Sequence, residues 1–589
     1  MNRRDVENTG PMRRPLFVAV FLVGLIGLTL GPYTQTGAQS LPSSATPATS
    51  TASATSATSA KLATSATTAT SATLATSTTS ATPATSATPT PNQPLFDFAP
   101  VSTIAVSTTG PTDPVFAAAE AKYNAPLVVS TQWHGFLQQL GRNIQITLPG
   151  PQTVSSVSIE MKQAPKIGVY FPDHVTVEVE HNGVWYLAAT VNSLTPTWSN
   201  SNSSEIFTAN LGNIQAQDII LRFPVSGWVF ARQIHVWGYQ NTAPNPFPAW
   251  PKVPQQYNTI MTASDVRSHG IRNMLLVYTG AGSSQSTWST HDFLPMTGYM
   301  NSKGRIVGRM FDTMLFLPAG KLQETQSAWL AYLNNLFTPG SQLAALNQAV
   351  ATTNWAVSGS GSLNFKEKVV IGIPQPNFGT GVWGTVHGVS LNFNGTWNDT
   401  NAVQARIAAV QWYVNTLLQK WKAAHLSDLK LAGLYWVDEK VNYRTPADLS
   451  VIQASGAFAN AVNLPLFWIP YYDAAGIQNW QSHGFTAAWL QPLYLDTGNT
   501  NPQRLTNAVQ LAQDTGMGLE IEAPWQVVSM PAYRNLYLQM LTTLENDKMA
   551  GNVSHAFYAG SKVLVTAAYA KNAADRSVYD ATYKFMNYK

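Results

Sequence analysis

The sequence predicts a multidomain protein in which an N-terminal all-β sandwich precedes a (β/α)8 TIM barrel, behind a signal peptide and a disordered Ser/Thr/Ala linker. Three observations predict this order. Residues 1–92 hold an apolar run and then a tract of Ser, Thr, Ala and Pro. Residues 93–242 alternate apolar and polar residues with the period of half-buried strands. Residues 243–589 alternate short apolar runs with helical stretches, which is the pattern of βα units.

Residues 1–38 have the order of a secretory signal. Arginines in MNRRDVENTGPMRRP precede the apolar run LFVAVFLVGLIGLTL, and small residues follow up to Ala38. The apolar run is shorter than the roughly 20 residues that a membrane span prefers. We therefore expect cleavage after Ala38, no membrane span in the cleaved protein, and an extracellular or cell-surface location. An uncleaved N-terminal anchor is the alternative.

Residues 39–92 form the linker, which consists almost entirely of Ser, Ala, Thr and Pro. Such a segment cannot bury enough apolar surface to offset the entropy lost on folding, so we expect an extended, disordered tether. The whole chain has no cysteine, which excludes disulfides and thiol catalysis. Its ten histidines are scattered without a metal-binding spacing, so we expect no metal and no cofactor.

The charge of the chain also limits its partners. Charged residues make up only 11% of the sequence, against about 25% in an average soluble protein. The net charge is +4 and no basic block stands out, so we expect no nucleic-acid partner. We expect a monomer whose partner is a carbohydrate or glycan, for the reasons given below.

The strand-like region 93–242 contains several short alternating segments separated by turns. They are NIQITLP, VSSVSIEMKQ, HVTVEVEHNGVWYLAATV, IFTANLG, DIILRFP and ARQIHVWGYQ. The HNGVW stretch places an Asn-Gly turn between Glu180 and Trp185, which is a strong hairpin signal. The order of elements resembles the discoidin-like (galactose-binding-like) modules found beside many secreted glycosidases. That resemblance leaves open whether the domain binds a ligand or only packs.

The region 243–589 contains eight apolar strands: NMLLVYT, TMLFLP, KVVIGIP, LKLAGLYWV, PLFWIPYY, AAWLQPLYL, GLEIEAP and SHAFYAG. After the third strand, one helical stripe is formed by Val403, Ile407, Val410, Val414, Leu417 and Trp421. A second helical stretch follows the sixth strand and ends at Gly516. Eight βα units predict a (β/α)8 barrel, although the link after the first strand is long. A doubly wound sheet is the alternative, but it has no Gly-rich phosphate loop to support it.

Two strands of this barrel end in carboxylates. Glu439 follows strand four in GLYWVDEKVNY, and Glu522 ends strand seven in GLEIEAPW. The loops after the strands converge at one face, so both acids would lie at the barrel mouth. Cleavage of a glycosidic bond needs such a pair. We predict that Glu439 is the acid/base and Glu522 the nucleophile of a retaining mechanism.

Two further points qualify this assignment. Glu520 lies on the same side of its strand as Glu522, and is a second candidate for nucleophile or tuning group. Asp438 points away from Glu439 and is expected to cap the following turn. A structural ion pair with Lys440 or Arg444 is the alternative role for either carboxylate. The placement on strands four and seven resembles that of a large superfamily of retaining glycosidases.

Other residues near strand ends are candidates for substrate binding. Aromatic rings stack on sugar faces, and amides or carboxylates bond to hydroxyls, although each residue alone could belong to the core or a turn. The candidates are Tyr471, Tyr472, Gln491, Trp525, Asp312 and Trp436.

The region from Asn273 onward resembles a bacterial family catalogued as domain of unknown function 4855. The resemblance depends on FDTMLFLP, KVVIGIPQP, GLYWVDE, AAWLQPLY and GMGLEIE in that order. It implies a glycosidase-like barrel. One departure is that APW follows Glu522, where an acidic residue would be expected. The sequence thus predicts a secreted retaining glycoside hydrolase for a polysaccharide or cell-surface glycan. A non-catalytic glycan-binding protein or a structural cell-surface protein on the same barrel is the alternative.

Overall fold

The computed structural model describes residues 94–588, except 196–198, 226, 254–257, 281–284, 359–364, 396–399, 443–447, 496–501 and 561. The predicted signal peptide and linker therefore lie outside the described residues. In the part that is described, we find no helix with both the length and the apolar character needed to cross a membrane. The β-rich N-terminal domain and the C-terminal barrel are described separately below.

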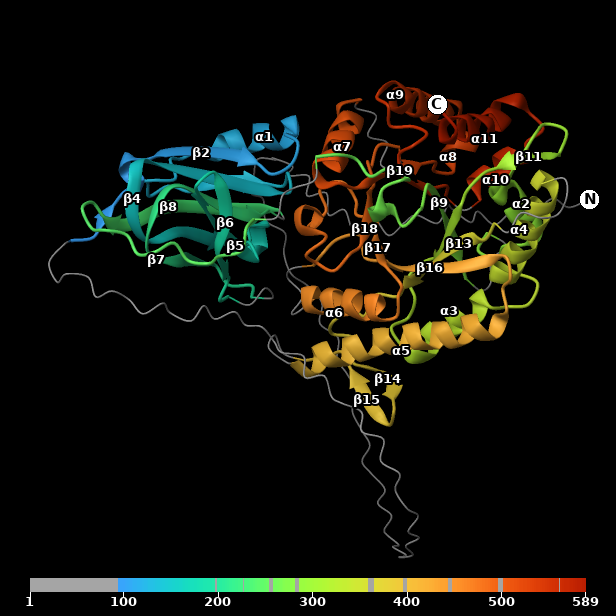
Figure 1. The fold of residues 1–589 in the computed structure, drawn as a ribbon, viewed down its shortest axis with the longest axis horizontal. Helices are drawn as coiled ribbons and strands as arrows, with labels where there is room; N and C mark the ends of the chain where they lie inside the picture. The colour runs from blue at the N-terminus through green and yellow to red at the C-terminus, as the bar shows by residue number, and fades with distance from the viewer. Residues whose placement is uncertain are drawn as a thin grey trace, which may run out of the picture. The chain divides into compact units, whose positions relative to one another are not determined.

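The N-terminal domain is built from antiparallel strands (Figure 1). They are β1 (Phe96–Asp97), β2 (Thr103–Thr108), β3 (His134–Leu137), β4 (Gly141–Gln163), β5 (His174–His181), β6 (Val184–Asn192), β7 (Ser203–Pro224) and β8 (Trp228–Tyr239), with helix α1 at Pro114–Glu120. The two longest strands, β4 and β7, pair over most of their length, with register shifts near Thr147 and Val154. The first half of β4 pairs with β2, and the second half pairs with β8. These strands form one eight-stranded sheet that contributes side chains to a single apolar core.

The predicted Asn-Gly turn is confirmed between β5 and β6. Asn182 has φ 53° and Gly183 has φ 78°, and His181 pairs with Val184. Left-handed backbone at both central positions is what a tight turn between right-twisted strands requires, and Asn followed by Gly tolerates it best.

Residues 243–253 pack on the N-terminal β domain, although the sequence predicts that the barrel domain begins at residue 243. Phe247 and Trp250 contact the core of this β domain. The Leu187 N–H donates to the Pro251 carbonyl and the Val253 N–H to the Trp185 carbonyl, both at 2.9 Å. The segment thus pairs with β6, which stands at one end of the strand order, and protects that strand from unwanted pairing.

We expect this segment to stabilise the N-terminal domain. The double substitution Phe247→Ala/Trp250→Ala should lower the domain's free energy of unfolding by about 2–4 kcal/mol, because two partly buried aromatic side chains are lost. Isolated residues 94–253 should likewise unfold at higher urea concentration than residues 94–242, with both giving strand-type circular dichroism. Equal midpoints for the two fragments would show that the segment contributes nothing.

The C-terminal region contains a closed barrel of parallel strands in chain order, as predicted. The strands are β9 (Asn273–Thr279), β12 (Thr313–Pro318), β13 (Glu367–Ile373), β16 (Leu429–Trp436), β17 (Leu466–Trp468), β18 (Ala487–Leu490), β19 (Gly518–Glu522) and β20 (His555–Tyr558). The barrel closes where β20 pairs with β9. The fourth and seventh strands predicted from the sequence are therefore β16 and β19.

Helices surround the barrel strands (Figure 1). They are α2 (Thr290–Thr297), α3 (Gln326–Leu336), α4 (Gln342–Ser358), α5 (Thr400–Ala424), α6 (Asp448–Ala461), α7 (Pro502–Thr515), α8 (Gln526–Ser529), α9 (Pro531–Asn546), α10 (Val563–Ala568) and α11 (Ala573–Met586). The long first link contains α2 and the hairpin of β10 (Gly298–Met300) and β11 (Ile306–Arg309). A second hairpin, β14 (Val382–Val386) with β15 (Val389–Asn392), precedes α5.

The predicted stripe of α5 is only partly the buried face. Val410, Val414 and Leu417 are buried, whereas Val403, Ile407 and Trp421 are half-buried. The buried face also includes the small residues Ala402, Ala405 and Ala409, which a search for large apolar side chains passes over.

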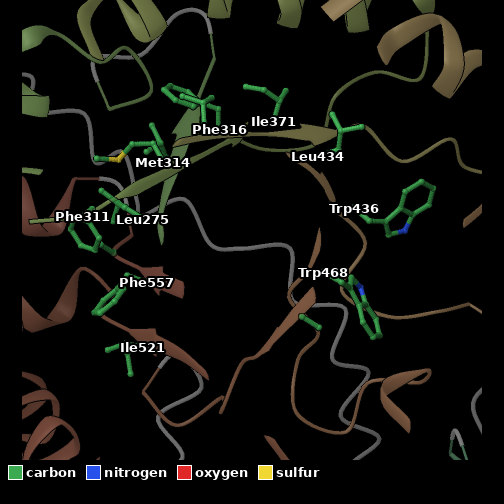
Figure 2. Packing of buried hydrophobic residues seen from close by; sticks show 14 of the residues in the cluster. Leu275, Phe311, Met314, Phe316, Ile371, Leu434, Trp436, Trp468, Ile521 and Phe557 are labelled. Carbon is green, nitrogen blue, oxygen red and sulfur yellow. The ribbon is translucent and has the colours of Figure 1, made fainter. Parts of the chain in front are cut away.

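Barrel side chains alternate between two cores. The outer core lies between strands and helices, and Figure 2 shows part of it, including Phe316, Trp436 and Ile521. The inner core fills the barrel and includes Leu276, Leu315, Val370, Tyr435, Phe467, Trp489 and Ala556. Successive residues of a strand point to opposite faces. Because Leu519 and Ile521 belong to the outer core, Glu520 and Glu522 face the barrel interior.

Candidate active site

Carboxylates from two distant parts of the chain reach the same end of the barrel. Glu522 is the last residue of β19, and Glu439 comes three residues after the end of β16. All barrel strands are parallel, and only β17 and β18 separate these two strands on one side of the ring. The carboxyl ends of the strands in this fold usually carry the chemistry.

Glu522 is fully buried and its carboxylate is held by backbone N–H groups. Its Oε1 accepts from the Leu493 N–H at 2.8 Å. Its Oε2 accepts from the N–H groups of Tyr494 at 2.8 Å and Leu495 at 2.9 Å. Three donors of this kind stabilise the ionised carboxylate and fix the segment that follows β18.

Glu520 is also fully buried and lies one inward position deeper on β19. Its neighbour on β20 is Ala556, a small residue of the inner core. On β18, the other neighbour of β19, Leu490 pairs with Leu519. The next residues of the two strands, Gln491 and Glu520, therefore lie opposite each other. The two glutamates of β19 therefore occupy successive levels of the barrel interior.

Asp438 and Glu439 are half-buried beside the end of β13. The Gln375 side-chain amide donates to Asp438 Oδ2. Burial raises the pKa of Asp438 to about 7; the carboxylates of Asp448 and Glu439 also raise it, while Lys440 and Gln375 oppose the shift. Asp438 was expected only to cap a turn, so sequence reasoning missed a carboxyl that titrates near neutrality. Its position beside Glu439 was the signal available.

Tyr471 and Gln491 connect the ends of β17 and β18 through a backbone bridge. Burial, and then the charges of Asp438 and Glu439, raise the pKa of Tyr471 to about 12. Its hydroxyl therefore stays protonated beside the β16 carboxylates. Gln491 is fully buried, and its amide donates to the Ile469 carbonyl at 2.8 Å.

The two remaining aromatic candidates near this end differ in exposure. The ring of Tyr472 is buried, and the Arg504 guanidinium lies 4.0 Å from its centroid, so one ring face is already covered. Trp525 directly precedes α8 and is 43% exposed. Of the two rings, only Trp525 is exposed enough to stack on a ligand.

Two predicted substrate contacts lie elsewhere. Trp436 is 1% exposed and faces the helix layer, because it occupies an outward position of β16 (Figure 2). Asp312 precedes β12, at the opposite, amino end of the barrel. There it accepts from the Asn273 N–H at 2.8 Å and pairs with Lys368 at 2.9 Å. Both residues lie near strand ends in the sequence. Strand direction places Asp312 at the amino end of the barrel, and side-chain alternation turns Trp436 outward, so neither belongs to the site.

The amino end of the barrel also holds a buried acid, Glu367, the first residue of β13. It is fully buried, and neither carboxyl oxygen has a hydrogen-bond partner among the described residues. Burial and the Asp312 carboxylate raise its pKa well above the usual value, against the opposing charges of Lys368 and Arg309. The Glu367 carboxyl is therefore neutral in the folded protein over a wider pH range than in the unfolded chain.

We expect Glu367→Gln to stabilise the protein at neutral pH. A raised carboxyl pKa in the fold favours folding fully only below the unfolded pKa, near 4.5, and this contribution is lost as pH rises. The advantage of the variant should thus grow from near zero at pH 4 to about 1–3 kcal/mol at pH 7. Urea unfolding of the full chain at several pH values measures it. The exposed Asp547→Asn is the control, and a pH-independent difference would contradict the prediction.

Among the residues that the structure describes, no group of three or more His, Cys, Asp or Glu side chains is placed to hold a metal ion. Carboxylates, a tyrosine and amides lie at this end of the barrel. These groups can donate or accept hydrogen bonds, and a carboxylate can also form a bond to an electrophilic carbon.

Comparison with family models identifies the C-terminal region. The model described as "Domain of unknown function (DUF4855)" matches residues 273–584. The chain belongs to this family. The match covers every strand of the barrel, and so includes both carboxylate-bearing strands, β16 and β19. No curated protein matches this DUF4855 chain.

Comparison with solved structures gives weak likenesses. The CBM22-1–GH10 modules of Clostridium thermocellum xylanase 10B are 10% identical, with 83% of this chain and 94% of that chain covered and a TM-score of 0.30. The family 32 CBM of C. perfringens NanJ is 16% identical, covering 24% and 98%, with a TM-score of 0.17. A Ruminococcus gnavus GH29 fucosidase is 13% identical, covering 24% and 26%, with a TM-score of 0.17. This chain spans about a quarter of that enzyme.

Proposed function

We propose that this DUF4855 protein is a secreted glycoside hydrolase that acts on a polysaccharide or a cell-surface glycan. The observation that carries the proposal is the convergence of carboxylates from β16 and β19 at one end of a closed barrel. Buried carboxylates are costly unless they are paired, bonded or functional, and two such strands end at the same face. The predicted signal peptide would take the enzyme outside the cell, and the linker would tether it to the surface only in the alternative case of an uncleaved signal.

The proposed chemistry divides the roles by environment. Glu439 is half-buried, so it can protonate the leaving oxygen and later exchange its proton with water. Below about pH 7 a neutral Asp438 spares Glu439 a like-charged neighbour. A carboxylate of β19 attacks the anomeric carbon in a retaining reaction, for which the two carboxyls must stand about 5–5.5 Å apart. The Tyr471 hydroxyl and the Trp525 ring are proposed substrate contacts.

The proposal is tested by a hydrolysis screen of the purified protein against glycans and aryl glycosides. Retention should appear as the initial formation of the same anomer in NMR spectra of the products. The double substitution Glu439→Gln/Glu520→Gln should abolish turnover of any substrate found. Full activity in that variant, or no hydrolysis of any member of a broad panel, would contradict the proposal.

A glycan-binding protein without hydrolysis is the second candidate. It is favoured by the three backbone N–H donors on Glu522, which commit this carboxylate to a structural role. This candidate predicts specific binding on a glycan array by a protein that leaves the bound glycans intact. It also predicts that Glu439→Gln changes affinity rather than any rate.

A further inference from the structure

We infer that Glu522 is a positioning residue that fixes the segment after β18, and that Glu520 is the nucleophile. The inference deepens the proposed function and depends on it for the second half. It reverses the order of roles predicted from the sequence, in which Glu522 was preferred because it stands closer to the end of the strand.

The hydrogen bonds of Glu522 carry the first step. Two N–H groups, from Tyr494 and Leu495, bond to Oε2, and the Leu493 N–H bonds to Oε1. A carboxylate oxygen has two lone pairs in the plane of the carboxylate, so these two N–H groups use both lone pairs of Oε2. The three donors are consecutive residues, so the Glu522 side chain fixes the backbone path of residues 493–495.

The segment itself needs such support. Leu493 has φ 50°, a left-handed conformation that is unfavourable for a side chain with a Cβ. The residue held in this conformation is the one whose N–H bonds to Oε1 of Glu522. Tyr494 and Leu495, next in the chain, insert their side chains into the outer core. The Glu522 carboxylate therefore offsets backbone strain at the point where the chain leaves the barrel.

The same bonds make Glu522 a poor nucleophile. When a carboxylate bonds to an anomeric carbon it becomes a neutral ester. Hydrogen bonds to a charged acceptor are stronger than those to a neutral one, so ester formation would weaken all three N–H bonds at once. The reaction would also have to disturb the strained segment that the carboxylate supports.

Glu520 is the other carboxylate that β19 contributes to the barrel interior, and it is the proposed nucleophile. It faces the barrel interior, as Glu522 does, and its neighbour on β20 is the small side chain of Ala556. In the first step Glu439 gives its proton to the leaving oxygen, the glycosidic C–O bond breaks, and a bond forms between the anomeric carbon and a Glu520 oxygen. In the second, water replaces Glu520 at that carbon and returns its proton to Glu439.

Amide hydrogen exchange of the full chain tests the positioning role without any substrate. In Glu522→Gln the amides of Leu493, Tyr494 and Leu495 should exchange at least about 10-fold faster, because a carboxamide keeps one neutral acceptor oxygen for at most two of the three N–H groups, and its N–H2 cannot accept the third. Glu520→Gln is the matched control, and should leave these three amides unchanged. Unchanged exchange in Glu522→Gln, or equal acceleration in both variants, would overturn the positioning role.

Covalent trapping tests the nucleophile. The probes are 2,4-dinitrophenyl 2-deoxy-2-fluoro glycosides of glucose, galactose, mannose and xylose, with peptide mass spectrometry of the labelled protein. We expect the label on Glu520, its loss in Glu520→Gln and its persistence in Glu522→Gln. Azide should restore turnover of dinitrophenyl glycosides to Glu520→Ala but not to Glu522→Ala. A label on Glu522 would overturn the assignment.

The two failures can be told apart. A wild-type protein that takes no label and hydrolyses nothing removes the proposed function, and the role of Glu520 with it. The exchange experiment would still decide whether Glu522 fixes the segment after β18. In an active enzyme, Glu522→Gln should raise KM more than it lowers kcat, because the segment moves while the reacting groups remain.

Discussion

Glu439→Gln should slow the hydrolysis of substrates with poor leaving groups by roughly 10²–10⁴-fold, because the leaving oxygen then departs without a proton. Glycosides of 2,4-dinitrophenol should lose far less of their first-step rate, since that leaving group is stable as an anion. The measurement is log kcat/KM against leaving-group pKa for a series of aryl glycosides. The slope should become steeper in the variant than in the wild type.

Asp438→Asn is the matched control for this prediction, because Asp438 precedes Glu439 directly and is also half-buried. Its carboxyl has a pKa raised to about 7, a value suited to a general acid, so the comparison is a demanding one. If Glu439 is the acid, Asp438→Asn should leave the slope unchanged. A steeper slope in Asp438→Asn, with a wild-type slope in Glu439→Gln, would transfer the role of acid to Asp438.

Asp448→Asn should lower the free energy of unfolding by about 3–5 kcal/mol, which is the usual cost of breaking a buried ion pair. Arg406 on α5 is fully buried and pairs with Asp448 at the start of α6. Arg406 also donates to the Pro376 carbonyl at 2.6 Å, one residue from Gln375. The substitution leaves a buried guanidinium beside an uncharged amide. Urea unfolding of the full chain, followed by tryptophan fluorescence, measures the loss.

Two controls distinguish the effect of the buried Arg406–Asp448 ion pair from the effect of removing any charge. Lys584→Met removes a largely exposed lysine, 3.9 Å from Glu545, and should cost less than about 1 kcal/mol. The double variant Arg406→Met/Asp448→Leu should recover much of the lost stability, because apolar groups of similar volume avoid the cost of a buried unpaired charge. A loss below about 1 kcal/mol in Asp448→Asn would mean that water or another group already screens Arg406.

Patterns within single elements were readable from the sequence. The period-two strands and the Asn-Gly turn at Asn182 gave the β-rich domain, because side-chain alternation and turn conformation are local properties. Eight apolar strands separated by helical stretches gave the closed barrel, and counting strands placed Glu439 after the fourth and Glu522 on the seventh. The resemblance to DUF4855 rested on motifs inside those same strands, and the family match bears it out.

Which partners each side chain meets was decided only by the tertiary structure. Glu522 bonds to backbone more than 25 residues away, and Asp438 bonds to Gln375, which is 63 residues away. Neither bond leaves a local pattern, since backbone N–H groups look the same at every position of a sequence. Asp312 ended at the amino end of the barrel because its apolar strand starts after it, not before it. Sequence by itself thus determined which strands carry the acids, whereas long-range hydrogen bonds and strand direction decided which groups each acid contacts.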